Sequence, residues 1–271
     1  MPADPKPTEP AWTDSRLSDP HGDPEKAKRV EQMFAAIAPS YDLNNRVHSF
    51  RRDQAWRKAA VRLAQVQPFD EIVDVACGTG DLTIAFADEL SRQTQGASPV
   101  VFGIDFTQEM LEIAKQKAAT SYAQPGFPED AEQSIKFVHG DAMNLDLPDA
   151  SVDIVSIAFG IRNVTDPLKA LSEFHRVLRP GGRLIVLEFT VPTNSLMRLG
   201  YNFYCGWLMP KTATLISGDK SGAYKYLPRS VSTFTGKAEL IEAMQTTGFG
   251  EVTAKSLTMG IAACYRGVKA G

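Results

Sequence analysis

The residues that decide the fold are Ile72-Val73-Asp74-Val75-Ala76-Cys77-Gly78-Thr79-Gly80-Asp81-Leu82-Thr83. An apolar, β-branched run is followed by a glycine turn and then by helix-forming residues. This order predicts a strand, a tight loop and the start of a helix, which is the opening of a doubly wound nucleotide-binding sheet. We expect Gly78 and Gly80 to shape a loop that binds a cofactor.

The same loop argues against a dinucleotide cofactor. A G-x-G-x-x-G fingerprint would place its third glycine at position 83, which is Thr83. Asp81 also stands at the expected helix N-terminus, where a carboxylate would repel the pyrophosphate that helix ends attract. A ribose-containing cofactor with a cationic centre and no phosphate suits the loop better, and S-adenosylmethionine (SAM) is such a cofactor. A glycine turn can also serve geometry alone, so this interpretation depends on the rest of the chain.

Acidic residues follow two further predicted strands at the positions that SAM requires. The strand over residues 100–104 is followed by Asp105, where such folds place an acid on the ribose hydroxyls. The strand over residues 135–139 is followed by Asp141 and Ala142, where a carboxylate and a backbone N–H can meet an adenine edge. We therefore expect an α/β fold of the class I SAM-dependent methyltransferases, a Rossmann-like seven-stranded sheet with helices on both faces and an N-terminal helical lid.

Composition and charge exclude several classes of protein. The 271 residues suffice for one large α/β domain, and the net charge of −3 argues against a nucleic-acid partner. The three cysteines and four histidines show neither disulfide nor metal-ligand spacing. We therefore expect no metal and a reducing, cytoplasmic location.

The chain is expected to divide into two parts. Residues 1–24 contain six prolines and no apolar targeting core, and we expect them to be a disordered tail. Residues 25–271 are expected to form the methyltransferase domain, with helical periodicity over residues 25–38 and again over residues 50–64. No apolar run reaches the roughly eighteen residues that a membrane span needs.

Four further motifs are more specific: Phe34-x-x-Ile37-Ala38-x-x-Tyr41-Asp42; Phe159-Gly160-Ile161-Arg162-Asn163-Val164; Arg176-Val177-Leu178-Arg179-Pro180-Gly181-Gly182-Arg183-Leu184 with Leu187-Glu188-Phe189; and Tyr226-Leu227-Pro228-x-Ser230-Val231. Together they resemble the C-methyltransferases of ubiquinone and menaquinone biosynthesis, which methylate a ring carbon of a polyprenylated quinol. The resemblance covers nearly everything from Val30 to Lys269.

The resemblance implies roles for particular residues. Tyr41 and Asp42 would close over the cofactor from the helical lid, the alternative being a helix-ending turn caused by Pro39 and Ser40. The cofactor positions of the family fall on Thr79, Asp105, Asp141 and Ala142.

The chain departs from the family pattern at three positions. The family's N-terminal motif usually reads Tyr-Asp-x-Met-Asn and then Ser-x-x-x-His-x-x-Trp, but Asn44 and Asp53 replace the methionine and the histidine. A fourth strand is predicted over residues 152–157, and a serine that often follows it in the family is Ala158 here. Roles of that histidine and that serine therefore do not transfer to this chain.

The chemistry of the implied reaction points to Arg162 and Asn163. SAM carries an activated methyl group, and a quinol carbon becomes nucleophilic when an adjacent hydroxyl loses its proton. Both residues follow the fourth predicted strand, at the sheet edge where substrates bind in such folds. We expect Arg162 to stabilise the phenolate, or to activate a water that takes the proton, and Asn163 to position the hydroxyl. The alternative is an arginine that binds loop carbonyls.

An apolar segment, residues 196–216, has only Arg198 and Lys211 as charged residues. Four interpretations stay open: a groove for the prenyl tail, a helix at a membrane surface, a homodimer interface, or a covered core helix. A second candidate for peripheral membrane contact is a basic cluster, which could equally be a solvated helix face. It consists of Arg46, Arg51, Arg52, Arg57, Lys58 and Arg62.

Two rival functions are disfavoured. The first is a nucleic-acid methyltransferase. Enzymes that methylate base amino groups usually show an Asp/Asn-Pro-Pro-aromatic motif after the fourth strand, but residues 158–160 read Ala-Phe-Gly. Enzymes that methylate C5 of a base need a nucleophilic cysteine, often in a Pro-Cys pair, and none of the three cysteines follows a proline. A SAM-binding protein without catalysis is the second rival. Within the family, demethylmenaquinol and a methoxy-polyprenyl-benzoquinol present similar ring carbons. Similarity of Asp74–Gly80 to menaquinone-branch members favours demethylmenaquinol.

Overall fold

A computed structural model describes residues 10–94, 100–122 and 135–271. Within them a single sheet has the strand order β3-β2-β1-β4-β5-β7-β6. Neighbouring strands are parallel except that β7 runs antiparallel to β5 and β6. The expected seven-stranded α/β sheet is therefore confirmed. The strands are β1 (Ile72–Val75), β2 (Val101–Asp105), β3 (Ile135–His139), β4 (Val152–Ala158), β5 (Leu178–Phe189), β6 (Phe249–Leu257) and β7 (Ala262–Lys269).

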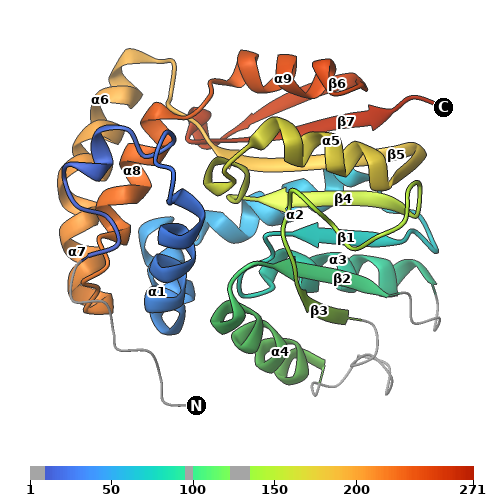
Figure 1. Cartoon of the computed structure of the whole chain (residues 1–271), viewed down its shortest axis with the longest axis horizontal. Helices are drawn as coiled ribbons and strands as arrows, with labels where there is room; N and C mark the ends of the chain where they lie inside the picture. The colour runs from blue at the N-terminus through green and yellow to red at the C-terminus, as the bar shows by residue number, and fades with distance from the viewer. Residues whose placement is uncertain (1–9, 95–99, 123–134) are drawn as a thin grey trace.

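Helices cover both faces of the sheet, and a further group caps one end of it (Figure 1). Helices α2 and α3 pack on one face, and α5 and α9 pack on the other. The cap stands beyond the carboxyl ends of the parallel strands and contains α1, α6, a π-helical turn, α7 and α8. The helices on the sheet are α2 (Arg52–Ala64), α3 (Asp81–Thr94), α4 (Gln108–Tyr122), α5 (Pro167–Val177) and α9 (Lys237–Thr246); those of the cap are α1 (Lys26–His48), α6 (Ser195–Phe203), the turn Tyr204–Leu208, α7 (Met209–Ser217) and α8 (Ala223–Thr233).

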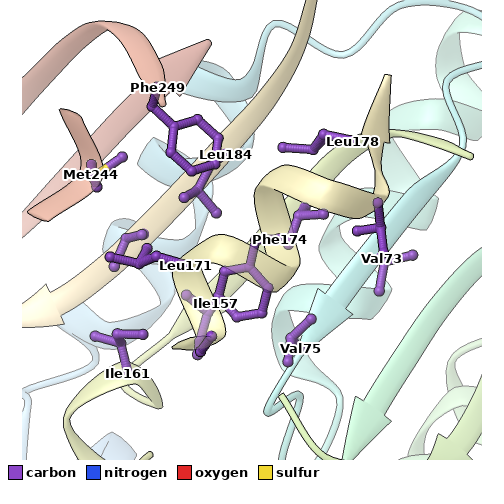
Figure 2. Packing of buried hydrophobic residues seen from close by; sticks show 14 of the residues in the cluster. Val73, Val75, Ile157, Ile161, Leu171, Phe174, Leu178, Leu184, Met244 and Phe249 are labelled. Atoms are coloured by element: carbon purple, nitrogen blue, oxygen red, sulfur yellow. The ribbon is translucent and has the colours of Figure 1, made fainter. Parts of the chain in front are cut away.

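Strand β1 is buried on both faces, as a central parallel strand requires. Its side chains alternate, so Ile72 packs toward α2 and α3 whereas Val73 and Val75 pack toward α5. Figure 2 shows Val73 and Val75 beside Phe174 of α5. This packing on two sides fixes where β1 ends, and so it fixes the position of the glycine loop that follows.

Helix α1 is longer than its sequence pattern indicates. The periodic residues predict a helix that ends near residue 38, but α1 continues through Pro39 to His48. Pro39 removes one backbone hydrogen bond from the helix, and its side chain is exposed, so the ring meets no packed neighbour there. Tyr41 and Asp42 therefore lie within a helix, and not on a helix-ending turn.

The structure differs from the expected disordered tail at residues 10–24, while residues 1–9 lie outside the described residues. Trp12 is only 1% exposed, and its ring stacks on that of Tyr226 with the centroids 4.4 Å apart. Leu17 is buried in the same cluster. An aromatic and an aliphatic anchor hold this proline-containing segment on the cap, so the folded unit begins before residue 25. We call residues 11–23 the strap.

Candidate functional site

Two adjoining cavities lie between the carboxyl edge of the sheet and the cap. The smaller one, which we call the cofactor cavity, has a volume of about 130 Å³ and lies where β1, β2, β3 and β4 end. The larger one, the cap cavity, has a volume of about 550 Å³ and lies between α1, α2, α6 and α8. Phe34, Tyr41 and Phe159 line both cavities and therefore form the wall that they share.

The two glycines of the loop after β1 are required for different structural reasons. Gly78 has φ +55°, and a Cβ there would meet no atom within 4 Å, because the residue faces the cofactor cavity. Gly80 has φ +80°, and its Cβ would come within 2.9 Å of the Phe137 ring. Gly78 thus leaves space for a ligand, whereas Gly80 permits close packing of loop and sheet.

Asp105 joins the loops that follow β1 and β2. Its carboxylate accepts hydrogen bonds from the N–H of Gly78 at 2.7 Å and from the N–H of Thr107 at 2.8 Å. Burial raises the pKa of this carboxyl. Asp141 and Ala142 line the same cavity, so the structure brings together the expected ribose and adenine positions.

Thr79 is turned away from the cofactor cavity toward the helical lid. Its hydroxyl donates to the carboxylate of Asp42 at 2.7 Å and accepts from Lys117 Nζ at 2.9 Å. Thr79 lines a small adjoining pocket together with Gly78 and Tyr41. The Thr79 side chain therefore links the glycine loop to α1. A cofactor would approach Thr79 from this adjoining pocket.

A network of charges fastens the glycine loop to the lid. Asp81 binds Arg46 of α1 at 2.9 Å and Lys117 of α4 at 2.8 Å. Burial would raise the pKa of Asp81, but the charges of Arg57, Lys117 and Arg46 outweigh it and lower that pKa to about 2. Asp53, which replaces the family's histidine, binds Arg46 at 2.8 Å and Arg57 at 3.0 Å.

This network changes the interpretation of the basic cluster. Arg46 and Arg57 point inward onto Asp53 and Asp81, so they do not belong to a solvated or lipid-facing surface. The other members of the cluster are exposed: Arg51, Arg52, Lys58 and Arg62.

Asp74 is a buried acid beneath the glycine loop that the motifs did not single out. It is 1% exposed in the middle of β1 and accepts hydrogen bonds from Thr83 at 2.7 Å and Ser156 at 2.6 Å. Burial raises its pKa to about 6, against those two hydrogen bonds. In the sequence, Asp74 could have been noticed as the single acid of an otherwise apolar strand. The Asp74 carboxylate holds β1, β4 and the start of α3 together beneath the glycine loop.

Arg162 lines the cap cavity, and its guanidinium is held by residues of the loop after β4 and of β5. Its Nη1 donates to Glu188 at 2.7 Å and to the carbonyl of Phe159 at 2.6 Å. The guanidinium also lies over the ring of Phe189. The pair with Glu188 is almost fully buried, and burial raises the pKa of that carboxyl although Arg162 opposes the shift. Arg162 therefore binds a loop carbonyl, as the alternative proposed, and also faces the cavity.

Asn163 lies on the cofactor side of the wall. Its side chain lines the cofactor cavity, donates to the carbonyl of Phe159 at 3.2 Å and accepts from the hydroxyl of Tyr226 at 3.0 Å. The structure thus separates the predicted pair: Arg162 lines the cap cavity and Asn163 the cofactor cavity.

The residues around the cofactor cavity suit SAM. The open space at Gly78 lies beside the Asp105 carboxylate, and apolar side chains from the β2 and β3 loops line the opposite wall. Gly78 and Asp105 would receive the ribose, Asp141 and Ala142 would receive the adenine, and Phe106 and Met143 would provide apolar contact for the base. Among the described residues, no group of three or more histidines, cysteines and acids is placed to hold a metal ion.

Comparisons with known proteins point to the same family as the motifs. Residues 23–269 match the model of the ubiE/COQ5 methyltransferase family. The chain is 41% identical to a demethylmenaquinone methyltransferase of Deinococcus radiodurans, over 92% of this chain and 97% of that protein. It is also 41% identical to a ubiquinone/menaquinone biosynthesis C-methyltransferase of Geotalea daltonii, over 90% of this chain and 98% of that protein.

Solved structures of lower identity share the fold. A SAM-dependent methyltransferase from Aquifex aeolicus has a TM-score of 0.54 at 16% identity, covering 91% of this chain and 98% of that one. The [4+2]-cyclase SpnF has a TM-score of 0.64 at 16% identity, covering 90% and 97%. These two likenesses concern the fold alone.

Proposed function

The chain belongs to the ubiE/COQ5 methyltransferase family and is a SAM-dependent methyltransferase, and we propose that it methylates a ring carbon of demethylmenaquinol. The observation that carries this proposal is the pair of adjoining cavities with a shared wall. The cofactor cavity, with the carboxylates of Asp105 and Asp141 on its wall, suits SAM, whereas the larger and mainly apolar cap cavity suits an aromatic ring with a hydrocarbon tail. The relatives named for menaquinone and for both quinones support the substrate class.

The arrangement of residues supports ring methylation. When bound, SAM supplies an electrophilic methyl group. Tyr41 and Phe159, on the shared wall, would hold the ring and the methyl donor in line and exclude water, which lowers the barrier through orientation. Arg162 lines the cap cavity, and its guanidinium would stabilise the negative charge of a ring phenolate.

A prenyl tail needs an apolar exit, and the cap provides one. Leu196, Met197 and Tyr201 of α6 line the cap cavity, so this helix forms its wall on the outer side. Neighbouring apolar side chains are exposed: Leu199, Phe203, Trp207, Leu208, Leu215 and Ile216. No acidic residue occurs between Glu188 and Asp219, which suits contact with an anionic lipid surface. We propose that this face, which we call the apolar face, lies on a membrane that holds the substrate; no helix among the described residues is long and apolar enough to cross one.

The test of the proposed function is methyl transfer from labelled SAM to two chemically reduced substrates in parallel, a demethylmenaquinol and a methoxy-polyprenyl-benzoquinol. We expect label in the naphthoquinol, and label in both would make the enzyme serve both pathways. Label in the benzoquinol alone would overturn the menaquinone assignment. Label in neither, with SAM binding retained, would overturn the quinol assignment.

A further inference from the structure

The strap is fastened to the helix that reaches the site. The N–H of Trp12 donates to the carbonyl of Ser221 at 3.0 Å, and its ring stacks on Tyr226 of α8. Gly222, just before α8, has φ +87° and no room for a Cβ beside the Trp12 carbonyl. The strap and the start of α8 are therefore built against each other.

Further contacts continue along α8. Arg229 donates to the carbonyl of Leu17 at 2.8 Å and to that of Ser18 at 2.9 Å. His21 Nε2 lies 3.0 Å from the carbonyl of Ser230. These bonds involve strap backbone or α8 backbone, so they hold the strap along the helix irrespective of most strap side chains.

Helix α8 in turn holds the loop after β4. The hydroxyl of Tyr226 donates to Asn163 Oδ1, which leaves Asn163 Nδ2 to donate to the carbonyl of Phe159. The same carbonyl accepts from Arg162 Nη1. A continuous series of contacts thus runs from Trp12 through Tyr226 and Asn163 to the acceptor that also holds Arg162.

A second connection runs through the first turn of α1. Lys26 is 1% exposed, and its Nζ donates to the carbonyl of Val164 at 2.7 Å, one residue beyond Asn163. Lys26 Nζ also lies 3.3 Å from His21 Nδ1 of the strap. The loop is therefore held at Asn163 by Tyr226 of α8 and at Val164 by Lys26. The strap contacts both of these residues.

We propose that the strap is a positioning element of the methyl-transfer site, and that Trp12 and Tyr226 act by fixing the orientation of the Asn163 amide. Neither residue is a catalytic group in this proposal, which rests on the proposed function for its turnover readout. The position of the amide matters because Asn163 lines the cofactor cavity and shares its acceptor with Arg162 on the other side of the wall. Loss of one neutral hydrogen bond corresponds to an effect of about threefold to tenfold.

The experiment is a double-mutant cycle between Tyr226→Phe and Asn163→Ala, read as the Kd of SAM and as kcat for methyl transfer. We expect Tyr226→Phe alone to weaken SAM binding about threefold and to lower kcat about tenfold. In the Asn163→Ala background we expect less than a twofold further effect, because Tyr226 acts through Asn163. Equal effects of Tyr226→Phe in both backgrounds would overturn the proposal.

Two further variants separate positioning from general destabilisation. Tyr224→Phe is the matched control on α8, since no hydrogen bond among the described residues joins the Tyr224 hydroxyl to the loop after β4, and its effect should be additive with Asn163→Ala. Trp12→Ala should reproduce the loss seen in Tyr226→Phe, and Trp12→Phe, which keeps a stacked ring, should restore most of it. Thermal unfolding identifies variants that are folded at the assay temperature.

The SAM-binding arm distinguishes this proposal from the proposed function, because it needs no quinol. Coupling of Tyr226 to Asn163 in the Kd of SAM, in a protein that methylates no quinol, would support the strap proposal and overturn the substrate alone. Methyl transfer to a quinol by the wild type, with additive effects of Tyr226→Phe and Asn163→Ala, would support the proposed function and overturn the strap proposal.

Discussion

Arg162 combines a buried charge with a place on the wall of the cap cavity. Its side chain is 5% exposed, that of Glu188 is 1% exposed, and the two are joined at 2.7 Å. A buried pair adds little stability compared with apolar residues of the same size, but the loss of one partner leaves an unpaired buried charge. The pair is therefore better explained by a function of the guanidinium than by stability.

This reasoning predicts different outcomes for stability and activity. Arg162→Met should lower the free energy of unfolding by about 3–5 kcal/mol, because Glu188 is left without its cation. A second change, Glu188→Leu, should restore most of that stability. Methyl transfer should stay reduced by about 100-fold or more in both variants, because each lacks the charge that we propose stabilises the phenolate. Urea unfolding and single-turnover kinetics measure the two quantities, and recovery of kcat in the double variant would show that Arg162 is structural.

Single residues near strand ends were the most predictable part of the site. Asp105 is the last residue of β2, and Asp141 and Ala142 stand just beyond β3, so the strand pattern located them at one edge, and all three line the cofactor cavity. Glu188 and Lys117 were not assigned, because their partners lie far away in the sequence and only the fold brings them together.

At the scale of elements, buried charges connect the lid to the glycine loop. Asp81 at the start of α3 is contacted by α1 through Arg46, by α2 through Arg57 and by α4 through Lys117. Four helices are thus held at one carboxylate. The acid that was expected to repel a pyrophosphate also anchors the lid, and both roles follow from its place at a helix N-terminus.

The low pKa of Asp81 gives this anchor a defined pH dependence. The folded-state pKa is about 2, below the ordinary value of 3.8, so the native state favours the ionised form. Its stabilisation, about 2 kcal/mol, should be present above pH 4 and lost as the pH falls through 2. The difference in unfolding free energy between wild type and Asp81→Asn should therefore shrink over that range.

Asp149→Asn is the matched control for this measurement. Asp149 pairs with Arg176 but is 79% exposed, so its pair is screened by solvent, and we expect a change below about 0.5 kcal/mol at any pH. A constant difference between wild type and Asp81→Asn from pH 7 to pH 2 would contradict a charge-based anchor.

The extent of helices and the order of the N-terminal segment were harder to predict than the strands. Apolar periodicity indicated the first part of α1, but Pro39 suggested an end that the exposed position of its ring makes unnecessary. Prolines and acids in residues 10–24 suggested disorder, whereas Trp12 and Leu17 supply enough apolar contact to hold the segment. Local composition does not predict that Trp12 packs on Tyr226, which lies over 200 residues away in the sequence.

At the scale of the whole molecule, the cap places the larger cavity at one end of the sheet. Helices α1, α6, α7 and α8 stand together beyond one end of the sheet (Figure 1). The cap cavity lies among them, and α6 and α7 also carry exposed apolar side chains. The sequence indicated the apolar segment but left four interpretations open, because composition cannot tell which side of a helix faces a cavity.

The membrane proposal predicts binding to anionic vesicles through the apolar face. We expect the wild type to sediment with vesicles of phosphatidylcholine and phosphatidylglycerol, and less with phosphatidylcholine alone, since the exposed cations add to the apolar contact. Leu199→Glu with Leu215→Glu should lower the bound fraction at least fivefold, because both side chains are largely exposed on this face, at 68% and 85%. Leu168→Glu is the matched control, an exposed leucine on α5 that is not part of the apolar face, and should bind like the wild type. Vesicle binding that is equal in all variants would contradict the proposal, and a wild-type dimer that the paired change dissociates would assign the face to a second copy of the chain instead.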